Sequence, residues 1–401
     1  MPVLNRIADF APEMAAWRQD IHAHPEMGFQ ERRTGDLVAA QLAAWGIEVH
    51  RGIATTGIVG VLRNGGSGRA IGLRADMDCL PMQERPADRP HRSTAEGRMH
   101  ACGHDGHTAM LLGAAKYLAE TRNFDGTVHF IFQPAEEGGG GGRVMVEEGL
   151  FDRFPCDQVF AIHNQPGIPL GEVAITAGPQ LAAADGVTIA IQGLGGHAAR
   201  PQGAIDPVLV GSHVVVALQS LVARRTDPLD SAVVSICQFH AGSAGNVIPD
   251  SAMLNGTIRT LKPETRALME TLVRQVAENT AAAHGATVEV TFRRGYPPMV
   301  NHAEASARAA EAAAQVVAPE RIRRNAPPAM GAEDFSYMLE RRPGCMIKLG
   351  QKGPDGEGGV PLHHPDYDFN DEAAPLGASI FAAIVEQELP RAGLGGARGG
   401  V

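Results

Sequence analysis

The chain has 401 residues, with 45 acidic and 35 basic side chains and a net charge of −10. This acidic balance argues against a nucleic-acid-binding protein, because affinity for phosphates needs a basic surface. At about 150 residues per domain, the length indicates two domains, or one large domain with an insertion.

The sequence also indicates where the protein is located and whether it contacts a membrane. The first 20 residues contain no signal-peptide pattern, and no run of apolar residues reaches the ~18 of a membrane helix. Five cysteines, an odd number without framework spacing, indicate a reducing compartment. We therefore expect a cytoplasmic protein without a membrane partner.

Predicted helices and strands alternate through the first part of the chain. Apolar residues at helical spacing predict one amphipathic helix from Leu4 to near Pro25, and a second helix over residues 34–45. Strands are predicted at residues 57–62, 70–75, 127–132 and 158–162, with a helix over residues 108–119 between them. This alternation predicts an α/β unit built around a central sheet.

The pattern changes near residue 185. Strand, helix, strand, strand, helix and strand are predicted in turn at residues 186–192, 206–223, 232–240, 252–260, 263–283 and 286–292. This is the order of a ferredoxin-like domain. A helix at 303–317, a strand at 345–349 and a helix at 374–389 then resume the α/β pattern. We expect residues 1–184 plus 298–401 to form one domain, with residues 185–297 inserted into it.

Four segments collect side chains that bind metals. They are MHACGHDGH at 99–107, QPAEEG at 133–138, AIHN at 161–164 and LHHPD at 362–366. Histidine, cysteine and carboxylate together form the ligand set of a borderline divalent cation. Three of the segments lie at predicted element ends, where open α/β sheets bind ligands.

Two features of these segments suggest how they divide the chemistry. In an extended backbone the side chains of Glu136 and Glu137 point to opposite sides, so one can bind metal while the other carries a proton. Cys102 and His104 are two residues apart, and a thiolate has a spare lone pair with which Cys102 could bridge two cations.

Eight motifs, in order along nearly the whole chain, resemble those of the M20 metallopeptidase clan. The likeness is greatest to its amidohydrolases: hippurate hydrolases, N-acyl-amino-acid amidohydrolases and plant auxin-conjugate hydrolases. The motifs are HAHPE at 22–26, LRADMD at 73–78, HACGHDGH at 100–107, FQPAEEG at 132–138, GGHAA at 195–199, GNVIP at 245–249, GAEDF at 331–335 and HHPDY at 363–367.

The resemblance implies a mixed-sheet, metallo-aminopeptidase-like catalytic domain with an inserted ferredoxin-like α+β lid or dimerisation domain. It also implies two divalent metal ions per subunit, zinc or manganese, with cobalt or nickel as further possibilities. The implied ligands are Cys102 as the bridge, with His104, Glu137, His163 and His363. His364 stays open as an alternative to His363, because many relatives have His-Asn-Pro where this chain has His-His-Pro.

Other roles carried by the resemblance lie around the metals. Glu136 is implied as the general base, and Asp78 as a support for the metal site. His197 is implied to stabilise the oxyanion, often in the partner subunit's site, and Asn246 with Arg259 to hold the substrate carboxylate. His100 and His107 are expected to pack or to support the site rather than to bind metal.

These expectations define a metal-dependent amidohydrolase that acts on small N-acyl amino acids as a homodimer or homotetramer. A carboxypeptidase or dipeptidase of the same clan is the alternative. A non-catalytic binding protein on the same scaffold would show a damaged base or ligand set, whereas every such position is intact here.

Overall fold

The computed structural model describes residues 3–391, which divide into two compact units. Within that range, unit 2 consists of Pro179–Met299 and Pro328–Ser336, and unit 1 of the remaining residues. The predicted insertion at 185–297 falls inside the first segment of unit 2. The predicted mixed α/β class is confirmed.

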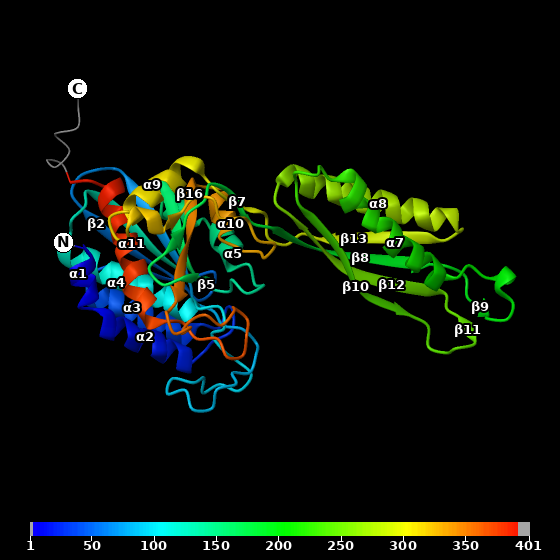
Figure 1. Cartoon of the computed structure of the whole chain (residues 1–401), viewed down its shortest axis with the longest axis horizontal. Helices are drawn as coiled ribbons and strands as arrows, with labels where there is room; N and C mark the ends of the chain where they lie inside the picture. The colour runs from blue at the N-terminus through cyan, green and yellow to red at the C-terminus, as the bar shows by residue number, and fades with distance from the viewer. Residues whose placement is uncertain (1–2, 392–401) are drawn as a thin grey trace, which may run out of the picture. The chain divides into compact units, whose positions relative to one another are not determined.

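Unit 1 is built on an eight-stranded mixed sheet (Figure 1). In spatial order its strands are β1 (Glu48–Ile53), β2 (Gly57–Asn64), β4 (Gly126–Gln133), β3 (Ala70–Asp76), β5 (Gln158–Pro169), β16 (Gly344–Lys352), β6 (Val173–Ala174) and β15 (Ile322–Arg323). In the centre of the sheet, β3 is parallel to both β4 and β5, and β5 is parallel to β16. All seven residues of β3 are buried, as expected for a parallel strand covered on both faces.

Helices cover this sheet and supply most of its core. They are α1 (Val3–Ala8), α2 (Ala11–Ala23), α3 (Arg32–Ala44), α4 (His104–Thr121), α5 (Gly141–Glu147), α6 (Leu150–Arg153), α9 (Ala303–Ala313) and α11 (Ala374–Glu388). α4 packs on α11, α2 and β3, and α9 packs on α11 and β16. Short α10 (Ser336–Leu339) lies where the chain passes between the units, as do strands β7 (Gly178–Leu181) and β14 (Met299–Asn301).

The predicted single helix at the start of the chain is wrong. The chain forms α1 and α2, separated at Asp9 and Phe10. Pro12 lies in the first turn of α2. Proline is tolerated there but would break the interior of a longer helix, because it lacks an N–H group and clashes with the preceding turn.

Unit 2 has the predicted ferredoxin-like order. Its elements are β8 (Ala183–Gln192), α7 (Pro207–Arg225), β10 (Ala232–Ala241), β12 (Ser251–Thr260), α8 (Pro263–Ala283) and β13 (Thr287–Arg293). The antiparallel sheet has the strand order β10-β12-β8-β13, and α7 and α8 pack against it. A separate two-stranded ribbon joins β9 (Gly196–His197) to β11 (Val247–Ile248).

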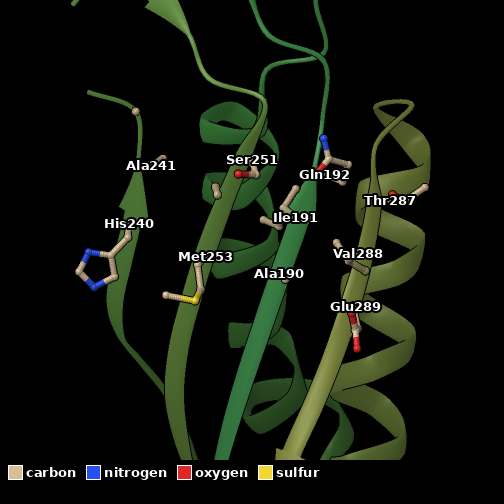
Figure 2. Close-up of a pocket in the computed structure, with 12 residues that line it drawn as sticks. Ala190, Ile191, Gln192, His240, Ala241, Ser251, Met253, Thr287, Val288 and Glu289 are labelled. Carbon is tan, nitrogen blue, oxygen red and sulfur yellow. The ribbon is translucent and has the colours of Figure 1, made fainter. Parts of the chain in front are cut away.

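One face of the unit 2 sheet is open. Figure 2 shows His240, Met253 and Glu289 among the side chains around a shallow pocket of about 690 Å³, with helices behind the strands. None of the predicted site residues lines this pocket.

Helix α7 is long and apolar enough to cross a membrane by length and composition alone, and no other helix among residues 3–391 is. The helix is not an uninterrupted apolar run, because it contains polar residues such as His213 and Gln219. α7 packs against β10, β12 and α8, and a core helix of a soluble protein passes the same test.

Candidate metal centre

A glycine allows the first two candidate ligands to lie next to each other. Cys102 precedes α4 and His104 begins it, with Gly103 between them at φ +89°. A Cβ atom on Gly103 would lie 2.5 Å from both Asn164 Oδ1 and Tyr367 Oη. Only glycine fits this left-handed, crowded position, so the Cys-Gly-His order follows from the geometry of the turn.

The structure brings all six of the predicted ligand and base residues together within unit 1. Ligand atoms of three groups each lie within 4.8 Å of one another: Cys102 with His104 and His163, Cys102 with Glu137 and His363, and His104 with Glu136 and Glu137. Cys102 belongs to two of these groups, with different partners in each. This is the arrangement expected of a ligand shared by two neighbouring cations.

The two histidines of the HHP motif differ in their surroundings. His363 Nε2 lies 3.2 Å from Glu137 Oε1. His364 Nδ1 instead accepts a hydrogen bond from the Asp366 N–H at 3.2 Å. No metal-competent group within residues 3–391 includes His364. The geometry therefore favours His363 over the alternative that the sequence left open.

Hydrogen bonds fix which nitrogen of each buried histidine faces the centre. His163 donates its Nδ1–H to its neighbour's carbonyl, Asn164 O, at 2.7 Å, which leaves Nε2 3.6 Å from Cys102 Sγ. His104 donates Nδ1–H to Asp78 Oδ1 at 3.1 Å. Such outer partners orient metal-binding imidazoles.

The free nitrogen of His104 is the observation that best fits a metal. His104 Nε2 is buried and has no hydrogen-bond partner in the described part of the chain. Buried polar atoms are almost always paired, so an orphaned nitrogen beside a thiol and two carboxylates matches an atom that binds a cation. The donor set fits two divalent metals.

The protonation of the cluster responds to burial and to local charge. Burial raises the pKa of the Cys102 thiol and lowers the pKa of His163 well below its usual value. Hydrogen bonds to Cys102 and Glu137 raise the pKa of His363 to about 10. Divalent cations would displace the protons of the thiol and of His363, so metal binding should release protons.

The two glutamates do not lie in extended backbone, as the sequence argument assumed. They lie in a turn after β4, in which Gly141 N donates to Ala135 O at 3.0 Å. Both carboxylates therefore reach His104, rather than pointing to opposite sides. Asp78 contributes to this turn as well, since its Oδ2 accepts the Glu137 N–H at 2.9 Å.

Beneath the ligands lies a buried layer in which sequence reasoning missed Asp76 and Arg74, although it expected His107 to pack or to support the site. Asp76 Oδ1 accepts from His107 Nδ1 at 2.5 Å, and His107 Nε2 lies 2.7 Å from Asn164 Oδ1. Arg74 pairs with Asp76 at 2.8 Å. The Asp-Met-Asp spacing at the end of β3, which places two carboxylates on one side, was the available signal.

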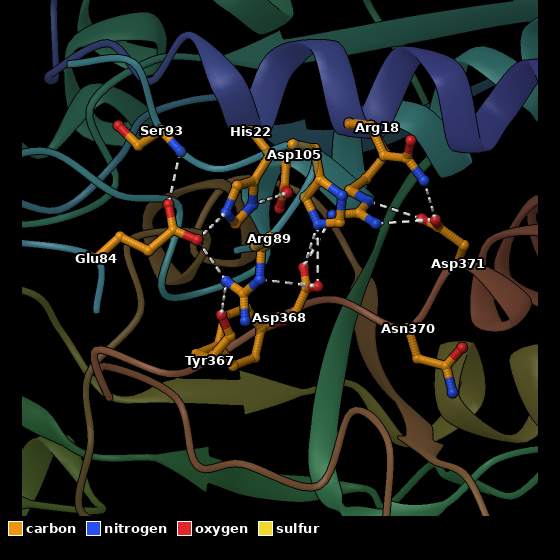
Figure 3. Close-up of polar contacts among 12 residues, drawn as sticks. Arg18, His22, Glu84, Arg89, Ser93, Asp105, Tyr367, Asp368, Asn370 and Asp371 are labelled. Atoms are coloured by element: carbon orange, nitrogen blue, oxygen red, sulfur yellow. Dashed lines mark hydrogen bonds and ion pairs between the residues drawn. The ribbon is translucent and has the colours of Figure 1, made fainter. Parts of the chain in front are cut away.

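A network of charges connects the metal-ligand loop to the loop that carries His363. His22 lies between Asp105, at 2.8 Å, and Glu84, at 3.3 Å. Burial lowers the pKa of His22, but the hydrogen bonds to these two carboxylates outweigh it and raise the pKa to about 9. Figure 3 shows Glu84 also facing Arg89. Arg89 donates to the backbone carbonyls of Asp366 and Tyr367 (3.1 and 2.8 Å), which fixes the chain just after His363.

The remaining predicted residues lie in unit 2. His197 and Asn246 are exposed and adjacent, on or beside the β9–β11 ribbon, where Ala198 N donates to Asn246 O at 3.1 Å. Arg259 lies near the far end of β12, opposite Ala184 at the start of β8. The β9–β11 ribbon is joined to the start of β12 at Asp250, whose Oδ1 accepts the Gly195 N–H at 2.8 Å.

That placement separates Arg259 from the His197 ribbon within unit 2. Arg259 is nine residues beyond Asp250 along an extended strand, or about 30 Å at 3.4 Å per residue. Figure 1 shows the ribbon at one end of the four-stranded sheet. Within a single chain, unit 2 therefore does not bring His197, Asn246 and Arg259 together at one point.

The Cys102 thiol gives a direct test of metal ligation. We expect alkylation of Cys102 to be slow in metal-loaded protein and to accelerate after chelation, because a metal-bound thiolate is shielded. Exposed Cys237 serves as the control and should label equally in both states. Mass spectrometry of the two cysteine peptides measures this, and equal Cys102 rates with and without metal would exclude it as a ligand.

A thiol, histidines and carboxylates gathered around the central strands of a mixed α/β sheet define a protein with a site for two divalent cations. The family model described as Peptidase family M20/M25/M40 matches residues 72–387. The chain belongs to this family.

Two curated relatives and one solved structure match over nearly the full length. The chain is 41% identical to hippurate hydrolase of Campylobacter jejuni, covering 97% of this chain and 100% of that one. It is 40% identical to IAA-amino acid hydrolase ILR1-like 2 of Arabidopsis thaliana, covering 96% and 89%. The YXEP protein of Bacillus subtilis, described as a dinuclear metal binding peptidase from the M20 family, matches with TM-score 0.84, 34% identity and coverage of 95% and 99%.

Proposed function

We propose that this protein is a metal-dependent amidohydrolase that cleaves the amide bond of N-acyl amino acids to a carboxylic acid and a free amino acid. The observation that carries the proposal is the cluster around Cys102, in which a complete ligand set lies beside a second carboxylate, Glu136. Full-length similarity to hydrolases of hippurate and of IAA–amino acids supports the substrate class.

Each residue of the cluster has a place in this chemistry. Cys102, His104, Glu137, His163 and His363 would hold two divalent cations, with Cys102 shared between them. Such cations lower the pKa of water toward ~7 and polarise an amide carbonyl. Glu136 accepts the proton of the attacking water and passes it to the leaving amine, as a general base and then a general acid. Asp78 orients His104 and the backbone of Glu137.

Unit 2 contributes recognition and charge stabilisation in this proposal. His197 donates a hydrogen bond to the developing oxyanion, and Asn246 and Arg259 bind the carboxylate of the amino-acid part. Zinc or manganese, with cobalt or nickel as further candidates, suits the mixed donor set. We further propose a cytoplasmic homodimer or homotetramer that uses residues 1–184 plus 298–401 for catalysis and residues 185–297 as its lid or dimerisation domain.

An activity panel tests the substrate class. Protein purified without chelator should contain about two divalent ions per chain and hydrolyse hippurate, N-acetyl amino acids or auxin–amino acid conjugates, with kcat/KM at least ~10-fold above that for dipeptides. Chelation should abolish the activity and added metal should restore it. A preference for dipeptides would instead support the carboxypeptidase or dipeptidase alternative.

A further inference from the structure

We propose that Glu31 is a positioning residue for the general base Glu136. This inference rests on the function proposed above, because it assigns Glu31 to the carboxylate that moves the proton. Glu31 directly precedes α3 and is fully buried, and none of the metal-competent groups within residues 3–391 contains it. A buried carboxylate is costly unless it is paired, so its partners indicate what it does.

Both oxygens of Glu31 accept hydrogen bonds, and one of these reaches the catalytic turn. Oε1 accepts the Ala135 N–H at 2.8 Å, and Oε2 accepts the Thr56 hydroxyl at 2.5 Å. Ala135 immediately precedes Glu136 and has φ +53°, a left-handed conformation that a residue with a side chain rarely adopts. Glu31 therefore bonds to the backbone where the chain is strained, one residue before the base.

Glycines surround this strained residue closely. A Cβ atom on Gly28 would lie 2.8 Å from the Cβ of Ala135, and one on Gly139 would lie 2.7 Å from it. The backbone can approach Ala135 from both sides only because these positions lack side chains. The packing limits where Ala135 lies, and the hydrogen bond that its N–H donates to Glu31 fixes the direction of that N–H.

Glu136 consequently lies between two backbone N–H groups that are each held by a buried carboxylate. Glu31 accepts from Ala135 N on one side, and Asp78 accepts from Glu137 N at 2.9 Å on the other. Asp78 also contacts the ligand His104, so it serves the metals. Within residues 3–391 the Glu31 carboxylate bonds to Ala135 N–H and the Thr56 hydroxyl and to none of the proposed metal ligands, so its effect should fall on the position of the base rather than on metal retention.

Replacing Glu31 by alanine should separate these effects. We expect Glu31→Ala to retain about two metals per chain and a KM within ~2-fold of wild type, but to lower kcat about 10–100-fold. A small displacement of a reacting group is enough for a loss of that size. Glu31→Gln should recover most of the activity, because its amide oxygen can still accept the Ala135 N–H.

Glu26 provides a matched control from the same segment. Its carboxylate accepts the N–H groups of Arg33 and Thr34 at the start of α3, and in the described part of the chain that carboxylate forms no hydrogen bond to the turn at 136–139. Glu26→Ala should lower the thermal unfolding temperature and leave kcat unchanged. If Glu31→Ala does not fold, Gly28→Ala tests the same turn from the other side and should lower kcat with metal content retained.

Several outcomes would overturn the assignment. These are an unchanged kcat in folded, fully metallated Glu31→Ala, an equal loss in Glu31→Gln and Glu31→Ala, or a defect in Glu31→Ala that is limited to thermal stability. The proposed function fails separately, if the wild-type protein with its two metals cleaves no N-acyl amino acid in the panel.

Discussion

The Glu136→Gln variant should bind both metals normally and lose about 10²–10⁴-fold in kcat, the usual contribution of a general base. Glutamine keeps the shape of the side chain, but its amide cannot accept the proton. Both glutamates lie near His104, but only Glu137 also forms a group with Cys102 and His363, so we assign Glu137 to the metals and Glu136 to the proton. Metal content by elemental analysis and single-turnover rates measure the two quantities.

Glu137→Gln is the matched contrast to this variant. It changes the neighbouring residue in the same way, yet it should lose metal as well as rate, because the carboxylate beside His363 Nε2 is removed. A fully metallated Glu136→Gln protein with near-normal turnover would show that another group is the base.

His197→Ala should bind metal normally, lower kcat about 10²–10³-fold and change KM little, as the loss of an oxyanion donor does. Its position also predicts which subunit it serves. Within unit 2, Arg259 and the His197 ribbon are about 30 Å apart at 3.4 Å per residue of strand. If both act at one metal centre, they therefore come from different subunits.

Mixing two inactive variants tests this arrangement. In a two-fold dimer with shared sites, a subunit with His197→Ala and a subunit with Glu136→Gln together form one intact site. Random exchange makes half of the molecules mixed dimers, so about a quarter of wild-type activity should return. A mixture of Glu136→Gln with Glu137→Gln, both altered in unit 1, should stay inactive. No recovery after verified exchange would mean that His197 acts within its own chain or not at all.

Much of the fold was predictable because its elements carry strong local signals. The predicted helix at 263–283 has the same bounds as α8, where Pro263 marks the start and apolar residues recur at helical spacing. β1 was not predicted, because its first five residues are exposed or half-buried and lack an apolar run. β5 extends seven residues beyond its predicted end at 162, so His163 lies inside a strand, held by its ladder with β16.

The candidate site was predictable to the extent that each residue lies in a recognisable motif. Cys102, His104 and Glu137 belong to short contiguous patterns whose spacing is meaningful by itself. Glu31 carries no such signal, because its role depends on the approach of Ala135, which is 104 positions away in the sequence. The separation of Arg259 from His197 is likewise a property of strand register that spacing along the chain does not reveal.

The position of β16 has a consequence for the order in which the chain can fold. β16 lies between β5 and β6, which are only three residues apart in sequence, and its ladder pairs Gly344 with Val159. The sheet of unit 1 thus stays open until a strand made about 180 residues later arrives, and such long-range pairing forms slowly. Most of unit 2, by contrast, is one continuous segment, Pro179–Met299. During synthesis it can become compact while the sheet that carries the metal ligands still lacks a central strand.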